Sequence, residues 1–208
     1  MFGNVIIGTY YNDPKKFDRL QLYVNVLRRV RTMSATDIQD AAGGADGAYC
    51  DAPFGFGQKP TRDFWPYTAT VITEREYLVP AYLIDGSEYI SSKGVERRNF
   101  RFQRRPTYVV KVTYKDKSFM YGYRKLYVDK ETFFLYLAEQ YDQKGRLYRT
   151  FESHVGFDPE TGTLGNGVLY GMIDHLDLHN TFTQSYYLPA LWLNRTDFGF
   201  EGVGKKGK

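Results

Sequence analysis

Histidine and aspartate residues alternate in the short segment "MIDHLDLHN", and imidazole and carboxylate groups are ligands that transition metals bind. On a strand, His175, Asp177 and His179 would share one face; on a helix, the two histidines would align at positions i and i+4. The segment has neither the ligand spacing nor the surroundings of a known metal motif. An exposed polar strand explains it better, and we predict no metal site.

No other segment has the spacing of a catalytic or cofactor-binding motif. A Gly-x-Ser-x-Gly sequence, which would place a nucleophilic serine beside a base, is absent. The glycines of "FGFGQKP" and "GTLGNG" are not followed by the Lys-Ser/Thr pair of a phosphate-binding loop. The carboxylate pairs Glu139/Asp142 and Asp129/Glu131 lie at predicted turns or strand ends, where solvated acids are ordinary. The sequence therefore predicts no enzyme activity and no cofactor.

Arginine residues gather in two short segments, and a guanidinium group binds carboxylate or phosphate through paired hydrogen bonds. One interpretation is a rim that contacts anionic headgroups or an acidic partner. The other is ordinary strand faces whose charges pair with the 24 acidic residues of the chain. The second is favoured because surface ion pairs are common and weak. The candidate contacts under the first interpretation are Arg28, Arg29, Arg31, Arg104 and Arg105.

Aromatic side chains make up 17% of the sequence, and tyrosine in particular suits β structure with one end packed and the other wet. Several lie in or beside residues 43–60, a stretch rich in glycine and proline that we expect to be a long loop or lid. Such a lid would close on an apolar ligand, or its aromatics would simply fill the core. The candidate ligand contacts are Phe54, Phe56, Trp65, Phe134 and Tyr136.

Length and composition indicate one globular domain over 1–208, or a large piece of one. The net charge of +4 permits contact with a membrane surface but is too small to favour a nucleic-acid partner. A single cysteine, Cys50, excludes an internal disulfide. Residues 200–208 are expected to form a flexible basic tail.

The sequence contains no apolar run of about eighteen residues, so it predicts no transmembrane helix. Its first segment, "MFGNVIIGTYYNDPKKF", lacks the charged and apolar regions of an export signal. Two expectations remain open: a cytoplasmic protein, or a chain without its natural N-terminus.

Alternating apolar residues and turn signals predict a mainly β protein: one large curved antiparallel sheet with few short helices. Turns are expected at "DKET" and "DQKG", and Pro80 predicts an edge strand or a turn. A short helix is expected at 34–42. The predicted strands are 2–11, 19–25, 68–77, 108–114, 123–128, 133–141 and 146–154, with one or two more across 168–182.

The strand predicted at 133–141 has apolar residues on both faces, whereas a sheet in water normally hides only one. Leaving a Phe or Leu side chain exposed forfeits about 1.5–3 kcal/mol, so the second face needs a cover. Helices, another part of the protein, a partner chain or an apolar ligand in a half-open barrel would each serve.

The run "LYVDKETFFLYLAEQYDQKGRLYRTFE" resembles the hairpin of a family of outer-membrane lipoprotein-sorting proteins that includes a domain of unknown function. In that pattern a strand ends in Asp-x-x-Thr, a second strand follows, and "YD-x-x-G" turns into a third. The segments "LYVNVLRRVRTM" and "RRPTYVVKVTY" fit the same pattern, and the resemblance covers most of 20–157.

The resemblance implies a fold like that of the LolA/LolB-type periplasmic lipoprotein carriers, an open half-barrel with an apolar cavity. It implies a non-enzymatic protein of the periplasm or outer membrane. Such a protein holds a lipid, a lipoprotein acyl chain or another apolar ligand on the concave face and passes it to a membrane partner. Related chains are longer and carry an export signal, so this chain resembles a C-terminal half or a shortened member. The alternative is an assembly subunit that docks its apolar face or sheet edge onto another chain.

Overall fold

Most residues in the described part of the computed structural model lie in strands or turns, and no described residue is α-helical. Nor do the described residues include a helix long and apolar enough to cross a membrane. The chain divides into two compact units, Met1–Pro66 with Leu191–Lys208, and Tyr67–Ala190. The residues described are 5–9, 11, 13, 15–16, 19–24, 27–33, 39, 47–48, 50–51, 66–81, 87–91, 94–98, 101–158, 163–178 and 180–185.

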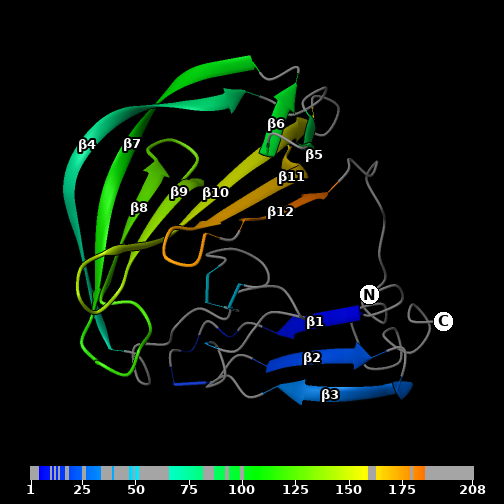
Figure 1. Ribbon diagram of the computed structural model, residues 1–208. Helices are drawn as coiled ribbons and strands as arrows, with labels where there is room; N and C mark the ends of the chain where they lie inside the picture. The colour runs from blue at the N-terminus through cyan, green and yellow to red at the C-terminus, as the bar shows by residue number, and fades with distance from the viewer. Residues whose placement is uncertain are drawn as a thin grey trace. The chain divides into compact units, whose positions relative to one another are not determined.

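The first unit contains a three-stranded antiparallel sheet in the order β1-β2-β3 (Figure 1). The strands are β1 (Val5–Thr9), β2 (Arg19–Val24) and β3 (Arg29–Met33). Both strands predicted near the N-terminus are confirmed, and the arginine-rich segment that follows them forms the turn into β3 and β3 itself. The helix predicted at 34–42 lies outside the described residues, apart from residue 39.

The second unit is built on a seven-stranded antiparallel sheet in the order β12-β11-β10-β9-β8-β7-β4 (Figure 1). A separate hairpin pairs β5 (Ser87–Ser91) with β6 (Gly94–Arg98). The strands of the large sheet are β4 (Tyr67–Ala81), β7 (Arg101–Tyr114), β8 (Tyr123–Asp129), β9 (Leu135–Tyr141), β10 (Leu147–Asp158), β11 (Thr163–Asp174) and β12 (Asn180–Ser185).

The prediction from Pro80 is confirmed, because β4 forms one edge of the sheet and pairs only with β7 among the described strands. An edge strand tolerates proline because one side of its backbone needs no hydrogen-bond donor. Several predicted strand boundaries are wrong. β4 and β7 are longer than expected, at 15 and 14 residues, and β9 begins at Leu135 instead of Phe133.

The buried face of the sheet changes along the strands. In β7, Thr107 and Val109 are buried near the middle, whereas Val112 and Tyr114 are buried nearer the end. Because β7 and β8 pair without a register shift, odd and even residues keep to opposite faces throughout. β8 makes the same change between Arg124 and Tyr127. In β7 and β8, each face is therefore fully buried over part of its length and half-buried or exposed over the rest.

Two buried zones result, one on each face. We name the zones after the residue numbers that they contain in β7 and β8. The odd zone lies toward the end of the sheet where β8 turns into β9. The even zone lies toward the opposite end, which carries the turns 115–122, 142–146 and 174–178. Members of the odd zone include Val79, Thr107, Val109 and Tyr127, and members of the even zone include Val112, Tyr114, Phe119, Ala138, Phe151 and Met172. Register shifts at Val71/Thr73 and Tyr127/Val128 lie near the changeover, where bulges bend and twist strands.

Two turns of the sheet use the same construction. Asp129 and Asp174 each end a strand, and each accepts hydrogen bonds on Oδ1 from the backbone N–H groups two and three residues later. Four residues after each aspartate, the backbone is left-handed, with φ 57° at Phe133 and 59° at Leu178. This conformation is why β9 begins two residues later than predicted.

Replacing Phe133 with glycine should stabilise the second unit by about 0.5–1 kcal/mol in urea unfolding. A left-handed non-glycine residue costs roughly 1–2 kcal/mol, and the extra freedom of glycine in the unfolded chain offsets only part of that gain. Little packing is lost because the Phe133 side chain is 69% exposed.

Leu178→Gly should give the same gain, since Leu178 is 81% exposed and equally left-handed. Lys144→Gly is the control, because Lys144 is an exposed turn residue outside the left-handed region, and it should lower stability. A loss in all three variants would contradict the strain at Phe133 and Leu178.

Candidate functional site

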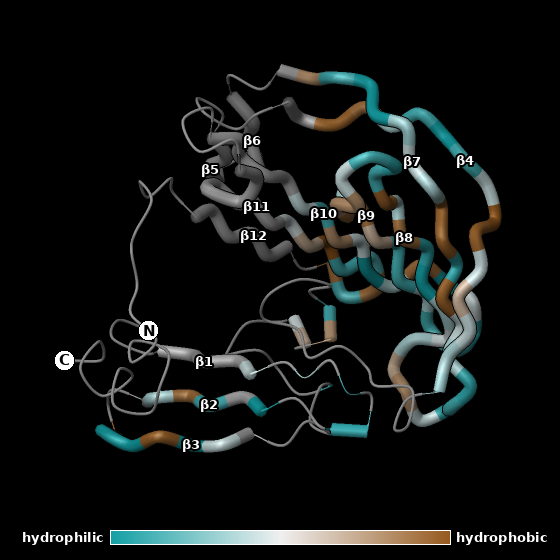
Figure 2. Tube along the Cα trace, turned by 180° about the vertical axis from the view of Figure 1, so that it is seen from behind, coloured by the Kyte–Doolittle hydropathy of each residue, from teal (hydrophilic) through white to brown (hydrophobic). Residues whose placement is uncertain are grey.

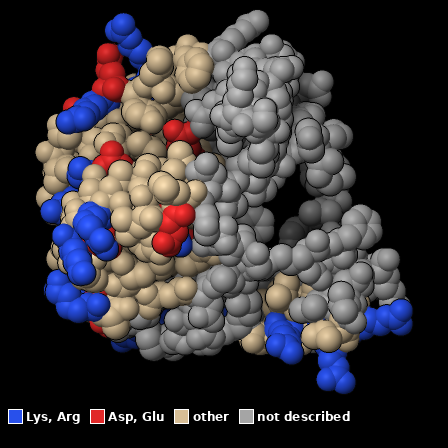
Figure 3. Space-filling view, in the orientation of Figure 1, with Lys and Arg blue, Asp and Glu red and all other residues tan. Residues whose placement is uncertain are grey.

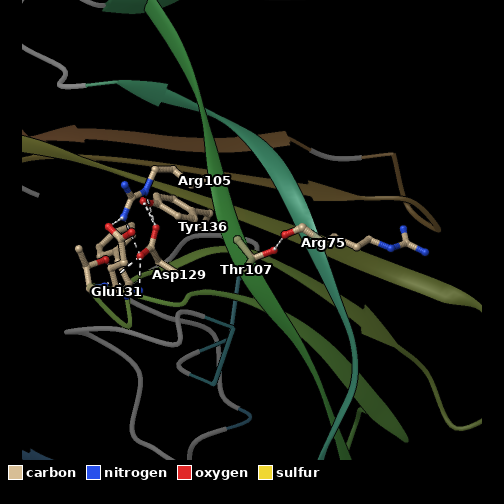
Figure 4. Close-up of polar contacts among 8 residues, drawn as sticks. Arg75, Arg105, Thr107, Asp129, Glu131 and Tyr136 are labelled. Atoms are coloured by element: carbon tan, nitrogen blue, oxygen red, sulfur yellow. Dashed lines mark hydrogen bonds and ion pairs between the residues drawn. The ribbon is translucent and has the colours of Figure 1, made fainter.

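A set of connected ion pairs and hydrogen bonds surrounds Asp129, at the turn between β8 and β9 (Figure 4). Its side chain is fully buried and accepts hydrogen bonds from Arg105 Nε at 2.8 Å, Arg105 Nη2 at 3.0 Å and the Tyr136 hydroxyl at 3.0 Å. Arg105 also donates to Glu131 at 2.7 Å. Thr107 donates to the backbone carbonyl of Arg75 on β4.

Ionisation of this cluster follows from its contacts. Burial opposes the charge on Asp129, but Arg105, two backbone N–H groups and Tyr136 hold its pKa well below the usual range. Hydrogen bonds to Asp129 and Glu131 raise the pKa of Arg105. Burial, with the bond to Asp129, raises the pKa of Tyr136 to about 12. The shifts in the pKa values of Asp129, Arg105 and Tyr136 thus keep each of these three groups in one protonation state near neutral pH, which favours a structural lock over acid–base chemistry.

A second polar set lies on the odd face, near the turns of the even zone. Tyr123 and Tyr141 stack with ring centroids 4.3 Å apart, and Glu139 accepts hydrogen bonds from the hydroxyls of Tyr127 and Tyr141. Burial and the contact with Glu139 raise the pKa of Tyr127 to about 12. Asp142, in contrast, closes its own turn with Arg146. Glu139 and Asp142 therefore serve different contacts and form no carboxylate pair.

The arginines selected from the sequence occupy different environments. Arg28, Arg29 and Arg31 are exposed in the first unit. In the second unit, Arg104 and Arg105 are neighbours on β7, so they point to opposite faces: Arg104 is exposed near Glu76, and Arg105 binds Asp129. On the drawn face of the described residues, basic side chains lie interspersed with acidic ones (Figure 3). Contact of these arginines with an anionic headgroup or partner stays a prediction.

The aromatic candidates are only partly described. Phe134 and Tyr136 form an edge-to-face pair with centroids 5.3 Å apart, next to the Asp129 cluster. Phe54, Phe56 and Trp65 lie outside the described residues, as do the tail 200–208 and most of the predicted loop 43–60.

The histidine segment forms a turn, whereas the sequence suggested a strand or a helix. His175 and Asp177 are exposed there, and His175 Nε2 lies 3.1 Å from Thr150 Oγ1. His179 lies outside the described residues. Among the residues that are described, no group of three or more His, Cys, Asp or Glu side chains has the arrangement of a metal site.

An exposed apolar patch on the edge strands was missed by the sequence analysis. Leu78 on β4 is 60% exposed, Phe102 on β7 is 50% exposed, and the side chain of Arg104 between them is 77% exposed. Leu78 pairs with Arg104, which places all three side chains on the even face. We call this set the edge patch. Figure 2 shows hydrophobic and hydrophilic stretches following one another along both strands, and this pattern does not predict which apolar side chains are exposed.

A row of buried polar residues in the even zone was also missed. Register places Arg124, Gln140, Arg149 and Asp174 side by side on four successive strands, β8 to β11. Their exposures are 5%, 0%, 7% and 2%. Arg149 Nε donates to Asp174 at 3.0 Å; burial opposes the charge on Asp174, but its backbone bonds and Arg149 keep its pKa lowered. We call these four residues the polar row.

An open, curved antiparallel sheet of this kind defines a fold shared with two solved structures. One is a domain from Vibrio parahaemolyticus named for outer-membrane lipoprotein sorting. It aligns with a TM-score of 0.59 at 16% identity, over 97% of this chain and 72% of that chain. The other, a DUF1329 family protein from Desulfovibrio piger, aligns with a TM-score of 0.58 at 16% identity, over 97% and 71%.

The chain belongs to the family described as "Protein of unknown function (DUF1329)", which matches residues 1–190. A LolA superfamily protein from Nitrosomonas europaea aligns with a TM-score of 0.41 at 18% identity, over 96% of this chain and 89% of that chain. No curated protein matches the sequence. The predicted family and the predicted mainly β, antiparallel fold are confirmed.

Replacing Asp129 with asparagine should destabilise the second unit by about 3–5 kcal/mol at pH 7, because a buried ion pair loses one partner. The folded-state pKa of Asp129 is lowered, so the ionised carboxylate stabilises the fold above its unfolded pKa of about 3.9 and this contribution is lost as pH falls through the folded value. The difference in free energy of unfolding between wild type and variant should therefore become smaller below about pH 4. Urea unfolding at several pH values measures it.

Asp142→Asn is the matched control. Asp142 accepts similar backbone and arginine hydrogen bonds, but its partner Arg146 has a side chain 58% exposed, and exposed pairs contribute only about 0–1 kcal/mol. Two results would contradict the stabilising role of the ion pair between Asp129 and Arg105. One is an equal loss of unfolding free energy in the two variants, and the other is a loss in Asp129→Asn that does not depend on pH.

Proposed function

We propose that this protein is a non-enzymatic carrier of the cell envelope, located in the periplasm or at the outer membrane. It binds a lipid, a lipoprotein acyl chain or another apolar ligand against its sheet and passes the ligand to a membrane partner. The edge patch is the observation that carries this proposal. The fold supports it, because one structure with the same fold is named for outer-membrane lipoprotein sorting.

The edge patch has the composition that an amphiphilic ligand requires. Covering an exposed Leu or Phe side chain gains about 1.5–3 kcal/mol, so an acyl chain laid over Leu78 and Phe102 would be bound favourably. Arg104 stands between them with most of its side chain in solvent, and its contact with Glu76 is long, at 3.7 Å. Its guanidinium would bind the anionic headgroup of such a ligand.

A carrier with this surface should retain apolar molecules during purification. Native mass spectrometry and solvent extraction of the protein, expressed from a full-length gene, should recover lipid. The double variant Leu78→Ser/Phe102→Ser should lose most of that lipid, because two apolar contacts are removed from the patch.

Leu178→Ser serves as the control, since it removes an even more exposed leucine from a turn far from the patch in the sheet. It should leave lipid recovery unchanged. The proposal would be contradicted if the wild type yields no lipid under conditions in which a known carrier keeps its ligand. Equal loss in the control would count against the patch.

The second candidate function is an assembly subunit, and the long edge strand favours it. β4 has 15 residues, and among the described strands only β7 pairs with it, so the outer backbone groups of β4 offer a template for another strand. Val71 and Ile72 on this strand are about half exposed. Size measurement distinguishes the two functions: an obligate complex favours the subunit, and a lipid-bound monomer favours the carrier.

A further inference from the structure

Gln140 in the centre of the polar row is buried without satisfying its hydrogen bonds. Its side chain is fully buried, and neither Nε2 nor Oε1 has a hydrogen-bond partner. A buried amide in this condition costs about 1–3 kcal/mol, and native proteins rarely leave one unexplained. A polar group bound beside Gln140, outside the protein chain itself, would remove that cost.

Two guanidinium groups flank this amide. Gln140 pairs directly with Arg124 on β8 and with Arg149 on β10, and directly opposite residues have Cβ atoms about 4.5–5.5 Å apart. Both arginines are more than nine-tenths buried. A ligand at Gln140 would therefore lie within reach of two guanidinium groups in a site shielded from water, where charge interactions are stronger. Arg149 is already paired with Asp174, so Arg124 is the main source of net positive charge.

Tyrosine rings lie beside both arginines. The Arg124 guanidinium lies 4.7 Å from the Tyr121 ring centre, and the Arg149 guanidinium 4.5 Å from that of Tyr148. Tyr121 and Tyr148 are themselves neighbours, with centroids 6.0 Å apart. These cation–π contacts, with a hydrogen bond from Arg149 to the Tyr148 hydroxyl, restrict the two guanidinium groups before a ligand binds.

We propose that the polar row binds an oxyanion, a phosphate or carboxylate group, with Arg124 and Arg149 contributing charge and Gln140 Nε2 donating a hydrogen bond. A hydroxyl on the same group, such as that of a monoprotonated phosphate, would donate to Gln140 Oε1. Access requires movement of the segment around Phe119 and Tyr121, whose carbonyls Gln143 holds with hydrogen bonds of 2.6 Å and 3.1 Å. This inference does not rest on the carrier proposal, because it uses neither the edge patch nor an apolar ligand.

Inorganic phosphate tests the site directly, by calorimetric titration and by the shift in melting temperature at constant ionic strength. Gln140→Met keeps the shape of the side chain and removes its unsatisfied polar atoms. It should melt at or above the wild-type temperature without phosphate, yet weaken phosphate binding about tenfold, the value of one hydrogen bond to a charged group. Lys144→Met removes an exposed positive charge instead and should bind phosphate like the wild type.

Gln140→Glu supplies the anion from within the chain. A carboxylate between Arg124 and Arg149 should be tolerated at pH 7, should abolish the phosphate-dependent shift, and should become destabilising when acid protonates it. A buried charge with no complementary site would instead lower the melting temperature strongly at pH 7. That result in Gln140→Glu would overturn the proposal even if Gln140→Met fails to fold.

Two further probes separate a free anion from a lipid headgroup. If decyl phosphate binds more tightly than phosphate and decanol does not bind, the site is assigned to a headgroup. If phosphate and decyl phosphate bind equally, the site is assigned to a small anion. Either result supports the site. Two results would overturn the site. If neither phosphate nor decyl phosphate binds, a structural water is the remaining partner for Gln140. If phosphate shifts the melting temperature equally in wild type and Gln140→Met, the shift is a general salt effect. Neither outcome decides the carrier function, which lipid recovery and the edge-patch variant test separately.

Discussion

The alternation of side chains along a strand is the constraint on which the second unit depends. Because the two buried zones lie on opposite faces of the same continuous strands, one register must satisfy both at once. A slip of one residue in β8 would turn Tyr127 out of the odd zone and Arg124 out of the even zone together. The register of β8 is therefore specified at both ends of the strand.

Aspartate residues at the strand ends fix that register. Asp129 joins the end of β8 to Arg105 on β7, and Asp174 joins the end of β11 to Arg149 on β10. Each carboxylate also organises its own turn through backbone N–H groups. Buried ion pairs add little net stability because desolvation opposes them, but a pair that forms only in the correct register penalises every other pairing. Their contribution is therefore specificity of pairing more than free energy.

Local patterns in the sequence were sufficient to locate the strands and turns of the large sheet, but they did not give the full lengths of β4 and β7 or the long-range pairing. The "DKET" and "DQKG" turns were predicted, and Gly145 is left-handed, with φ 79°, as its turn requires. The partner of Arg105, in contrast, is 24 residues away and depends on register, so a cluster of arginines in the sequence gives no sign of it. Gln140 lies in a stretch of β9 that becomes polar and reads as solvated, yet it is fully buried. Gln140 is buried because it lies on the face that is covered at this end of the sheet. The sequence of β9 alone does not show which face is covered.

The edge patch and the polar row lie on the same face of the sheet but belong to separate sites. Arg104 of the patch and Val112, which pairs with Arg124, stand on β7 at a separation of about 27 Å for an extended strand. A single headgroup cannot contact both arginines, so each site must bind its own group. The burial of the two sites also differs: the patch offers hydrophobic contact at the surface, and the row offers charge and hydrogen bonds in a shielded interior. A surface of the first kind exchanges ligands rapidly, whereas a site of the second kind needs the chain to open. An oxyanion in the row would therefore stabilise the even zone, and with it the register on which the odd zone depends.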